Sequence, residues 1–281
     1  MNEETIYQER DLKLVLTDIE DGIVRLQDVD EERIIQSMLH HIGSTDPELR
    51  DQLIYTLFYR FIIEDDQLTN EQLTNMLKTT LKYHLFHGIG EEASDTVFTR
   101  SFSTLLIALI VHQDRQQGFL SETDIDTLKA KLLAYLDCEI DTRGYVPTKG
   151  WAHSIAHVAD AFDELVLHPH LDETEFGEIL EALWDKVMSP SIYVHDEDER
   201  LLNPIFALLQ RGMDEHEIIV LLEGLPARLR VQKQQLELEH YWYVVHNMKT
   251  FLKSLFVKLH GSNRDTLQMT VFLTLKNSDW A

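Results

Sequence analysis

The sequence has almost no cysteine. Cys138 is the single cysteine among 281 residues, so no intrachain disulfide can form, and a reducing compartment fits this composition. Its acidic neighbours, Asp137 and Glu139, disfavour a thiolate. We therefore expect Cys138 to be a small core residue rather than a nucleophile.

Glycine and proline are scarce as well. The chain has 11 glycines and 6 prolines, too few for a turn-rich all-β protein. Leucine, glutamate and glutamine are frequent, which favours helices. Apolar residues make up 44% of the chain, enough to bury a core. The composition thus indicates a helical protein.

Positive charge and long apolar runs are also lacking. The 25 lysines and arginines face 49 acids, and the net charge of −24 repels phosphate backbones and anionic lipids. The longest apolar stretch, Leu105–Val111, is far shorter than the roughly 20 residues of a membrane span. The first residues, MNEETIYQERD, lack the basic and apolar regions of a signal peptide. We expect a cytoplasmic protein that binds neither nucleic acid nor membrane.

Charge is unevenly distributed along the chain. Residues 225–281 carry eight lysines and arginines against four acids, which makes this segment +4 and residues 1–224 −28. A solvated basic face explains this pattern. Alternatively, the basic segment docks on the acidic part, within one chain or in a homodimer.

Apolar residues recur with helical spacing along most of the chain. Thr69, with Gln72 three residues later, has the pattern of a capping box at a helix start. Pro47 is typical of a first helical turn. We predict helices over Val29–Ile42, Leu49–Ile63, Thr69–Leu85, Ser94–Gln113, Ser121–Leu136, Thr148–Val166, Glu173–Met188, Asp196–Gln210, Asp214–Leu222, Gln232–His260 and Asn263–Thr274.

Successive helix starts lie very roughly 20–25 residues apart, the scale of HEAT-type helix pairs. Short polar connections favour antiparallel neighbours, although no repeated motif is detectable. We predict one all-α domain over residues 1–281, a curved α/α solenoid-like (HEAT-like) array of antiparallel helix pairs, with a hinge at 138–149. A globular helical bundle is the alternative.

The segment DTRGYVPTKGWAHSIAHVADAFDEL (141–165) holds the most distinctive residues. His153, His157, Asp160 and Glu164 follow one another at helical spacing on the side opposite an apolar arc. Two histidines one turn apart can share a divalent metal, with Asp160 as an oxygen ligand. The segment lacks the glutamate of HExxH, so it assigns no catalytic residue. A hydrogen-bonded polar stripe is the plainer interpretation.

Cationic and aromatic side chains surround the predicted start of this helix. Arg143, Lys149 and Trp151 could bind a phosphate or carboxylate at free backbone N–H groups. In the alternative interpretation, Arg143 pairs with an acid such as Asp141, and Trp151 belongs to the core.

A second polar cluster, HDEDERLLN (195–203), opens the predicted helix 196–210. Helix capping explains many of its acids, although Glu199 and Arg200 could still line a site. Arg100 precedes the most apolar helix and needs an acidic partner if it is buried. We expect that partner among the acids of this cluster.

RGYVPTKGWAHSIAHVAD (143–160), with RSF at 100–102 and EDERL at 197–201, resembles the bacterial family called domain of unknown function 2785. The likeness spans most of the chain, and GWAHSIAHVAD is its most specific part. The resemblance implies an all-helical protein of Gram-positive-type bacteria. It supplies neither an activity nor catalytic residues.

These observations lead to three hypotheses. We favour a non-enzymatic binding or scaffold module, which holds a protein or small-molecule partner in a polar groove beside the helix that starts near Lys149. The alternative is a metal-dependent hydrolase centred on His153, His157 and Asp160, and a divalent metal is then its cofactor. The third is a structural protein whose polar stripe faces solvent.

Overall fold

A computed structural model describes residues 6–277 and 280. Two short strands, β1 (Tyr145–Val146) and β2 (Gly150–Trp151), form an antiparallel hairpin. The α-helices are α1 (Glu9–Glu20), α2 (Glu31–His40), α3 (Thr56–Tyr59), α4 (Asn70–Thr79), α5 (Thr96–Gln117), α6 (Glu122–Cys138), α7 (Ser154–Val166), α8 (Phe176–Val187), α9 (Glu197–Gln210), α10 (Glu215–Gln235), α11 (Leu238–Leu259) and α12 (Asp265–Asn277). Shorter helical segments are η2 (Leu26–Asp28), η3 (Glu48–Tyr55), η4 (Arg60–Glu64), η5 (Thr80–His84) and η6 (Glu173–Glu175).

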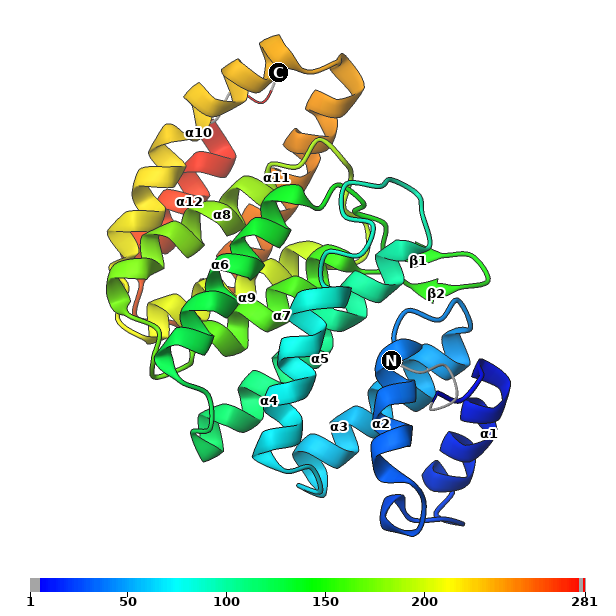
Figure 1. Cartoon of the computed structure of the whole chain (residues 1–281). Coiled ribbons are helices and arrows are strands. Elements are labelled where there is room, and N and C mark those ends of the chain that lie inside the picture. Colours follow the sequence, from blue (N-terminus) through cyan, green and yellow to red (C-terminus); the bar gives the residue numbers. More distant parts are fainter. Residues whose placement is uncertain (1–5, 278–279, 281) are drawn as a thin grey trace.

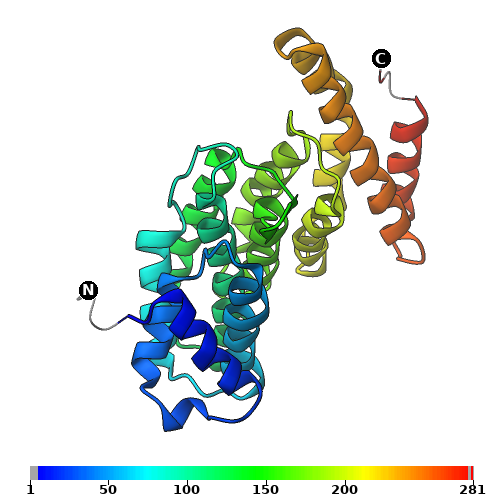
Figure 2. The same ribbon diagram turned by 90° about the vertical axis from the view of Figure 1, so that its right-hand side faces the viewer.

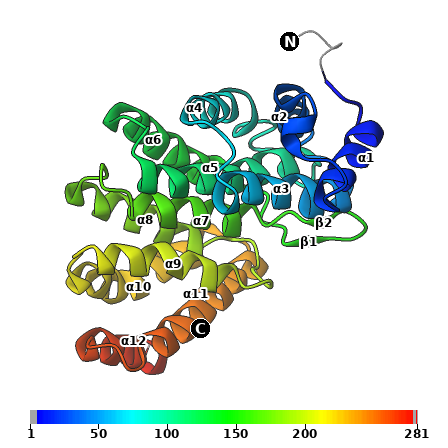
Figure 3. The same cartoon turned by 90° about the horizontal axis from the view of Figure 1, so that it is seen from below.

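The helices stack in chain order, with α1 and α12 at opposite ends (Figures 1 and 2). Helix α7 lies at the centre, because it packs against α5 on one side and α9 on the other. Helices α6 and α8 pack against each other and against this central row (Figure 3). The molecule is therefore an all-α array, as the sequence predicts.

Helix α5 carries the densest part of the core. Its residues from Val97 to Val111 are buried with the exception of Thr99. Arg100 is among them, and its fully buried guanidinium pairs with Glu139, Nε to Oε2 at 2.5 Å and Nη2 to Oε1 at 3.0 Å. The expected partner within 195–203 is thus wrong. Glu139 is the partner of Arg100 because it directly follows the end of α6, which lies beside α5.

Local sequence signals place several helix ends. Thr69 and Gln72 form the predicted capping box at the start of α4. Helix α10 instead runs on past the predicted end at Leu222, through Pro226 to Gln235. Leu222, Leu225 and Leu229 are all buried, and this continuous apolar stripe outweighs the effect of the proline.

Helix α7 begins later than predicted. The sequence analysis starts it at Thr148, but residues 145–151 form the hairpin and the first helical residue is Ser154. Thr148 and Gly150 have φ of 68° and 81°, in the left-handed region, which breaks a right-handed helix. The groove predicted beside Lys149 therefore lies against a hairpin rather than a helix start.

The surface holds one further difference from expectation, and it bears on one alternative that the sequence left open. Cys138 is exposed at the end of α6 rather than buried in the core. The basic C-terminal segment contacts the acidic part of the same chain, through ion pairs of Arg228 with Asp185 and Arg264 with Glu215.

Among the described residues, no helix combines the length and the apolarity that crossing a membrane requires.

Candidate metal centre

The most unusual group of side chains lies where α7 and α9 begin. The N-termini of α5, α7 and α9 lie on the same side of the array. The hairpin contacts residues at each of these N-termini. Lys149 Nζ in the hairpin turn binds the carboxylate of Asp95 at the start of α5, at 2.6 and 2.7 Å. His153 is the N-cap residue of α7, and Asp196 is that of α9. Residues distant in sequence therefore meet at this edge.

His153, His195 and Glu197 converge at this edge. One potential ligand atom from each lies within 4.8 Å of the other two. Glu197 Oε2 accepts a hydrogen bond from the backbone N–H of His195 at 2.8 Å, which fixes the carboxylate. Its other oxygen, Oε1, lies 3.8 Å from His153 Nε2. This distance is too long for a hydrogen bond, so the two groups face each other without bonding.

One ring nitrogen of each histidine in this group is buried and unpaired. His153 Nε2 and His195 Nδ1 have no hydrogen-bond partner among the described residues. Glu197 is only 1% exposed. Unpaired buried polar atoms are rare, because each forfeits its hydrogen bond to water. Two of them beside one buried carboxylate call for a further partner.

Burial also sets the protonation state of the group. It lowers the pKa of His153 to about 4, with smaller contributions from Arg200 and His195, so the imidazole is neutral at neutral pH. Burial likewise raises the pKa of the Glu197 carboxyl above its usual value. Neutral imidazole is the form that coordinates metals.

Backbone conformation contributes to this arrangement. His153 has φ 47° and ψ 38°, and Asp196 has φ 64° and ψ 21°, both in the left-handed region. Such conformations cost a non-glycine residue about 1–3 kcal/mol and cluster at functional sites. They turn the chain sharply as it enters each helix, so His153 projects toward the start of α9.

Trp151 and Gly144 enclose the histidines. The Trp151 ring lies 4.4 Å from the His153 ring and 5.3 Å from the His195 ring, centroid to centroid. A Cβ atom at Gly144 would lie 2.2 Å from His195 Nδ1, so only glycine leaves room for that ring. A cavity of about 420 Å³ opens beside them, and its wall includes Gly144, His195 and Glu197.

Arg50 holds the hairpin in place. Its fully buried guanidinium donates hydrogen bonds to the carbonyl oxygens of Lys149 at 2.7 Å and Ser44 at 2.7 Å. The rings of Phe98 and Phe102 lie 4.2 and 4.8 Å from its guanidinium carbon. Cation–π contacts of this kind help to compensate a buried charge.

Comparison with protein families places this geometry in context. Residues 85–257 match the model of the family described as protein of unknown function (DUF2785). The chain belongs to this family. No curated protein and no solved structure matches the chain. All three converging residues lie within the matched range, whereas Arg50 lies before it.

The DUF2785 segment also contains the cationic and aromatic residues proposed from the sequence. Arg143 binds Asp141, Nε to Oδ1 at 2.8 Å and Nη2 to Oδ2 at 2.6 Å. Its guanidinium also donates to the Ser94 carbonyl at 2.7 Å. Arg143 thus has the alternative role, and Lys149, for which the sequence suggests no acidic partner, pairs with Asp95. Trp151, at 41% exposure, is not a core residue.

Of the three metal ligands predicted in this DUF2785 segment, only His153 belongs to the converging group. His157 is 6% exposed, and its ring packs edge-on against Phe102 at 5.2 Å. It is therefore part of the core, contrary to its predicted place on an open stripe. Asp160 binds Arg200, Nε to Oδ1 at 2.7 Å, so its carboxylate already has a cation.

Glu164 and Glu199 lie further from the converging group. Glu164 accepts hydrogen bonds from His112 at 3.1 Å and from Arg115. Glu199 is exposed and lines a cavity of about 470 Å³ together with Arg200. Glu164 and Glu199 thus line different cavities, one along α7 and one along α9.

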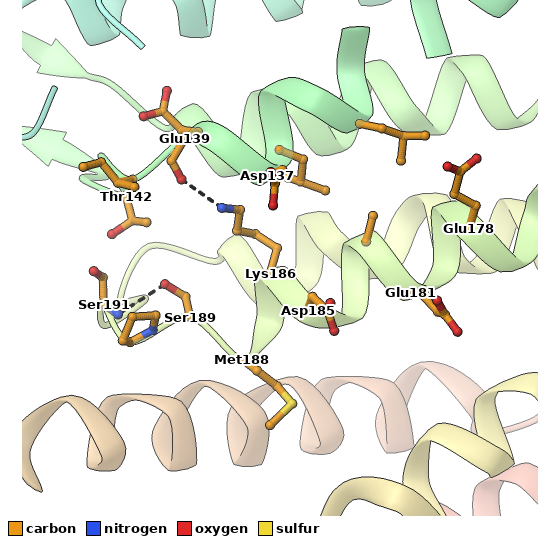
Figure 4. A pocket seen from close by; sticks show the side chains of 15 residues that line it. Asp137, Glu139, Thr142, Glu178, Glu181, Asp185, Lys186, Met188, Ser189 and Ser191 are labelled. Atoms are coloured by element: carbon orange, nitrogen blue, oxygen red, sulfur yellow. Dashed lines mark hydrogen bonds between the residues drawn. The ribbon is translucent and has the colours of Figure 1, made fainter. Parts of the chain in front are cut away.

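A further cavity of about 450 Å³ lies between α6 and α8. Figure 4 shows Lys186 extending toward Glu139 among acidic side chains that include Asp137 and Asp185. Lys186 Nζ donates to the Glu139 backbone carbonyl at 2.8 Å, and burial lowers its pKa. The lysine therefore ties α8 to the end of α6, which is a structural role.

Proposed function

We propose that this protein binds a divalent transition-metal ion through His153, His195 and Glu197, and that the adjoining cavity receives a ligand at the metal. The observation that carries the proposal is the convergence of His153, His195 and Glu197, together with two buried ring nitrogens, His153 Nε2 and His195 Nδ1, that lack hydrogen-bond partners among the described residues. A metal ion would satisfy these donors together.

Zinc fits this donor set best. Two imidazoles and one carboxylate are a common ligand set of zinc sites that leave one position open. Ligand bonds of about 2.0–2.1 Å in a tetrahedral site put neighbouring donor atoms about 3.3 Å apart. The donors here lie within 4.8 Å of one another, so side-chain rotation must bring them closer by up to about 1.5 Å.

An ordinary ion pair accounts for the group less well. Attraction between His153 and Glu197 requires a protonated imidazole, yet the pKa of His153 is lowered to about 4 by burial. At neutral pH the two side chains therefore form no ion pair. Their 3.8 Å separation agrees with this absence of a bond.

The cavity supports the binding module inferred from the sequence. It has about 420 Å³, within the range of small-molecule sites, and His195 and Glu197 lie on its wall. Three protein ligands leave a coordination position for a ligand atom from this cavity. The ligand site proposed from the structure therefore lies at the starts of α7 and α9, and not in the groove that the sequence predicts beside Lys149.

Metal-dependent hydrolysis is the second candidate, and the open coordination position favours it. A metal-bound water there could act as a nucleophile. Binding remains preferred because the two buried carboxylates near the donors, Asp141 and Glu197, are not free to act as a general base. Asp141 binds Arg143, and Glu197 is itself a ligand in the proposed site.

A cobalt titration tests the metal site. Tag-free protein treated with a chelator should develop the visible absorption of four-coordinate Co²⁺ and saturate at one equivalent. Trp151 fluorescence should be quenched in parallel, because its ring lies 4.4 Å from that of His153. His153→Gln and Glu197→Gln should abolish both signals, whereas the exposed His216→Gln should retain them.

Equal cobalt absorption in wild type and Glu197→Gln would contradict the site. If the site forms, the zinc-loaded protein is then assayed for hydrolysis of a p-nitrophenyl ester. Zinc-dependent turnover that is lost in Glu197→Gln supports the hydrolase. Zinc binding without turnover leaves the binding module preferred.

A further inference from the structure

Another cavity lies along α7, and Asp160 is one of its lining residues. Its volume is about 350 Å³, and it is bounded by the carboxyl-terminal half of α7, the middle of α5 and the segments η3 to η4. Leu105, Ala108 and Leu109 of α5 provide an apolar wall. Tyr55, Tyr59 and Ile63 face them from the N-terminal part of the chain. This is the size of a site for a small organic molecule.

The cavity contains one carboxylate that bonds to no cation among the described residues. Three acids of α7 line it, and two of them are bound to arginines, Asp160 to Arg200 and Glu164 to Arg115. The third, Asp163, is only partly exposed and has no hydrogen bond or ion pair among the described residues. Among the described residues Asp163 is therefore the one acid of this cavity without a bonded cation.

The two cations that lower the pKa of Asp163, Lys258 and Arg115, bond to other residues. Arg115 binds Glu164, and Lys258 Nζ binds the neutral amide of Asn203 at 2.5 Å, so both stabilise the Asp163 charge without bonding to it. Burial raises the pKa of Asp163 to about 6, and the neighbouring Glu164 and Asp160 add to this rise. At neutral pH Asp163 is thus ionised and poorly solvated, and such a carboxylate favours a cation.

The two tyrosines complement this charge. Neither the Tyr55 nor the Tyr59 hydroxyl has a hydrogen-bond partner among the described residues, and Tyr59 is 41% exposed. Tyrosine faces attract organic cations, and their hydroxyls can accept hydrogen bonds from N–H groups. A carboxylate, two tyrosines and an apolar wall match a molecule with one positive charge and an apolar body.

We propose that the cavity formed by Tyr55, Tyr59 and Asp163 binds a small organic cation, an ammonium or guanidinium group on an apolar body. Asp163 neutralises the charge, the tyrosines enclose it, and α5 contacts the apolar part. This site is separate from the proposed metal centre and does not depend on it.

Calorimetric titration with benzylammonium tests the proposal. Wild-type protein should bind this probe at one equivalent, at least about tenfold more tightly than neutral benzyl alcohol. Asp163→Asn should weaken benzylammonium binding by at least about tenfold and leave benzyl alcohol unaffected. Tyr59→Leu should also weaken it. Asp126→Asn, which removes the same charge from an exposed position of α6, should bind like wild type.

Thermal unfolding of each variant confirms that the fold is retained. Equal binding of benzylammonium and benzyl alcohol by wild type would overturn the proposal. So would unchanged benzylammonium affinity in a folded Asp163→Asn variant. Removal of metal by a chelator should not affect the titration, which separates this site from the metal centre.

Discussion

His153 and Gly144 show how single residues set the geometry of the candidate centre. His153 enters α7 in the left-handed conformation, and this turn brings its imidazole to Glu197 on a different helix. Gly144 leaves the space that the His195 ring occupies. Helix propensity explains neither residue, because glycine and histidine are both weak helix formers. Their roles are those expected of a site that positions ligands.

Gly144→Ala should disrupt the metal centre without removing a ligand. The new Cβ atom would lie 2.2 Å from His195 Nδ1, so the ring must move. We expect Co²⁺ affinity to fall by at least about tenfold and stability to fall by about 1–3 kcal/mol. Cobalt and urea titrations measure the two effects.

Gly177→Ala is the matched control, because a Cβ atom at this position of α8 meets nothing within 4 Å. It should keep cobalt affinity and raise stability by up to about 1 kcal/mol. Wild-type cobalt affinity in Gly144→Ala would refute the positioning role of this glycine.

At the scale of elements, buried polar contacts fix how helices meet. Arg100 of α5 and Glu139, next to the end of α6, are both 0% exposed and pair in the core. Tyr135 Oη donates a further hydrogen bond to Glu139 at 3.0 Å. The sequence indicates that Arg100 needs a partner, but it does not reveal which acid lies beside it. That choice depends on the packing of α6 against α5.

Glu139→Gln should therefore destabilise the fold by about 3–5 kcal/mol, since it leaves the Arg100 charge buried without its counter-charge. Urea unfolding followed by circular dichroism measures this. Arg228→Gln breaks an ion pair whose Asp185 side chain is 65% exposed, and it should cost less than about 1 kcal/mol. Similar costs for the two variants would contradict this account.

Helix boundaries also show what local sequence determines. The capping box at Thr69 predicts the start of α4, because capping depends on residues three positions apart. The start of α7 is not predictable in this way. There the hairpin is held by Arg50, which hydrogen-bonds to the Lys149 carbonyl from a distant part of the chain.

At the scale of the whole molecule, stacking in chain order brings together residues that are distant in sequence. The sequence predicts the all-α array and His153 as a candidate ligand. It does not predict His195 and Glu197 as partners, because they begin a different helix. The cluster at 195–200 suggests Glu199 and Arg200 as site residues, whereas the burial of Glu197, which singles it out, is visible only in the fold. The finer likeness to HEAT repeats stays a prediction.

Burial of ionisable groups makes the stability of the array depend on pH. Burial, with smaller effects of His40 and His87, lowers the pKa of His84 from 6.5 to about 4. The unfolded chain therefore takes up a proton in this range that the folded chain does not. The contribution of His84 to stability is complete above pH 6.5 and is lost as pH falls toward 4.

Between pH 7.5 and pH 5, wild type should lose roughly 2 kcal/mol relative to His84→Gln. Asp163 has the opposite sign, because its pKa is raised to about 6 and its contribution is lost as pH rises. Wild type should therefore gain relative to Asp163→Asn over the same fall in pH. Urea unfolding at both pH values gives the two differences, and a pH-independent difference for His84→Gln would contradict the sign.

The most direct test of the central claim is the zinc content of tag-free protein after equilibrium dialysis against Zn²⁺ and removal of unbound metal. The donors His153, His195 and Glu197 predict one zinc per wild-type chain, none in Glu197→Gln and one in His216→Gln. Wild-type protein without retained zinc, or Glu197→Gln with one equivalent, would contradict the metal centre.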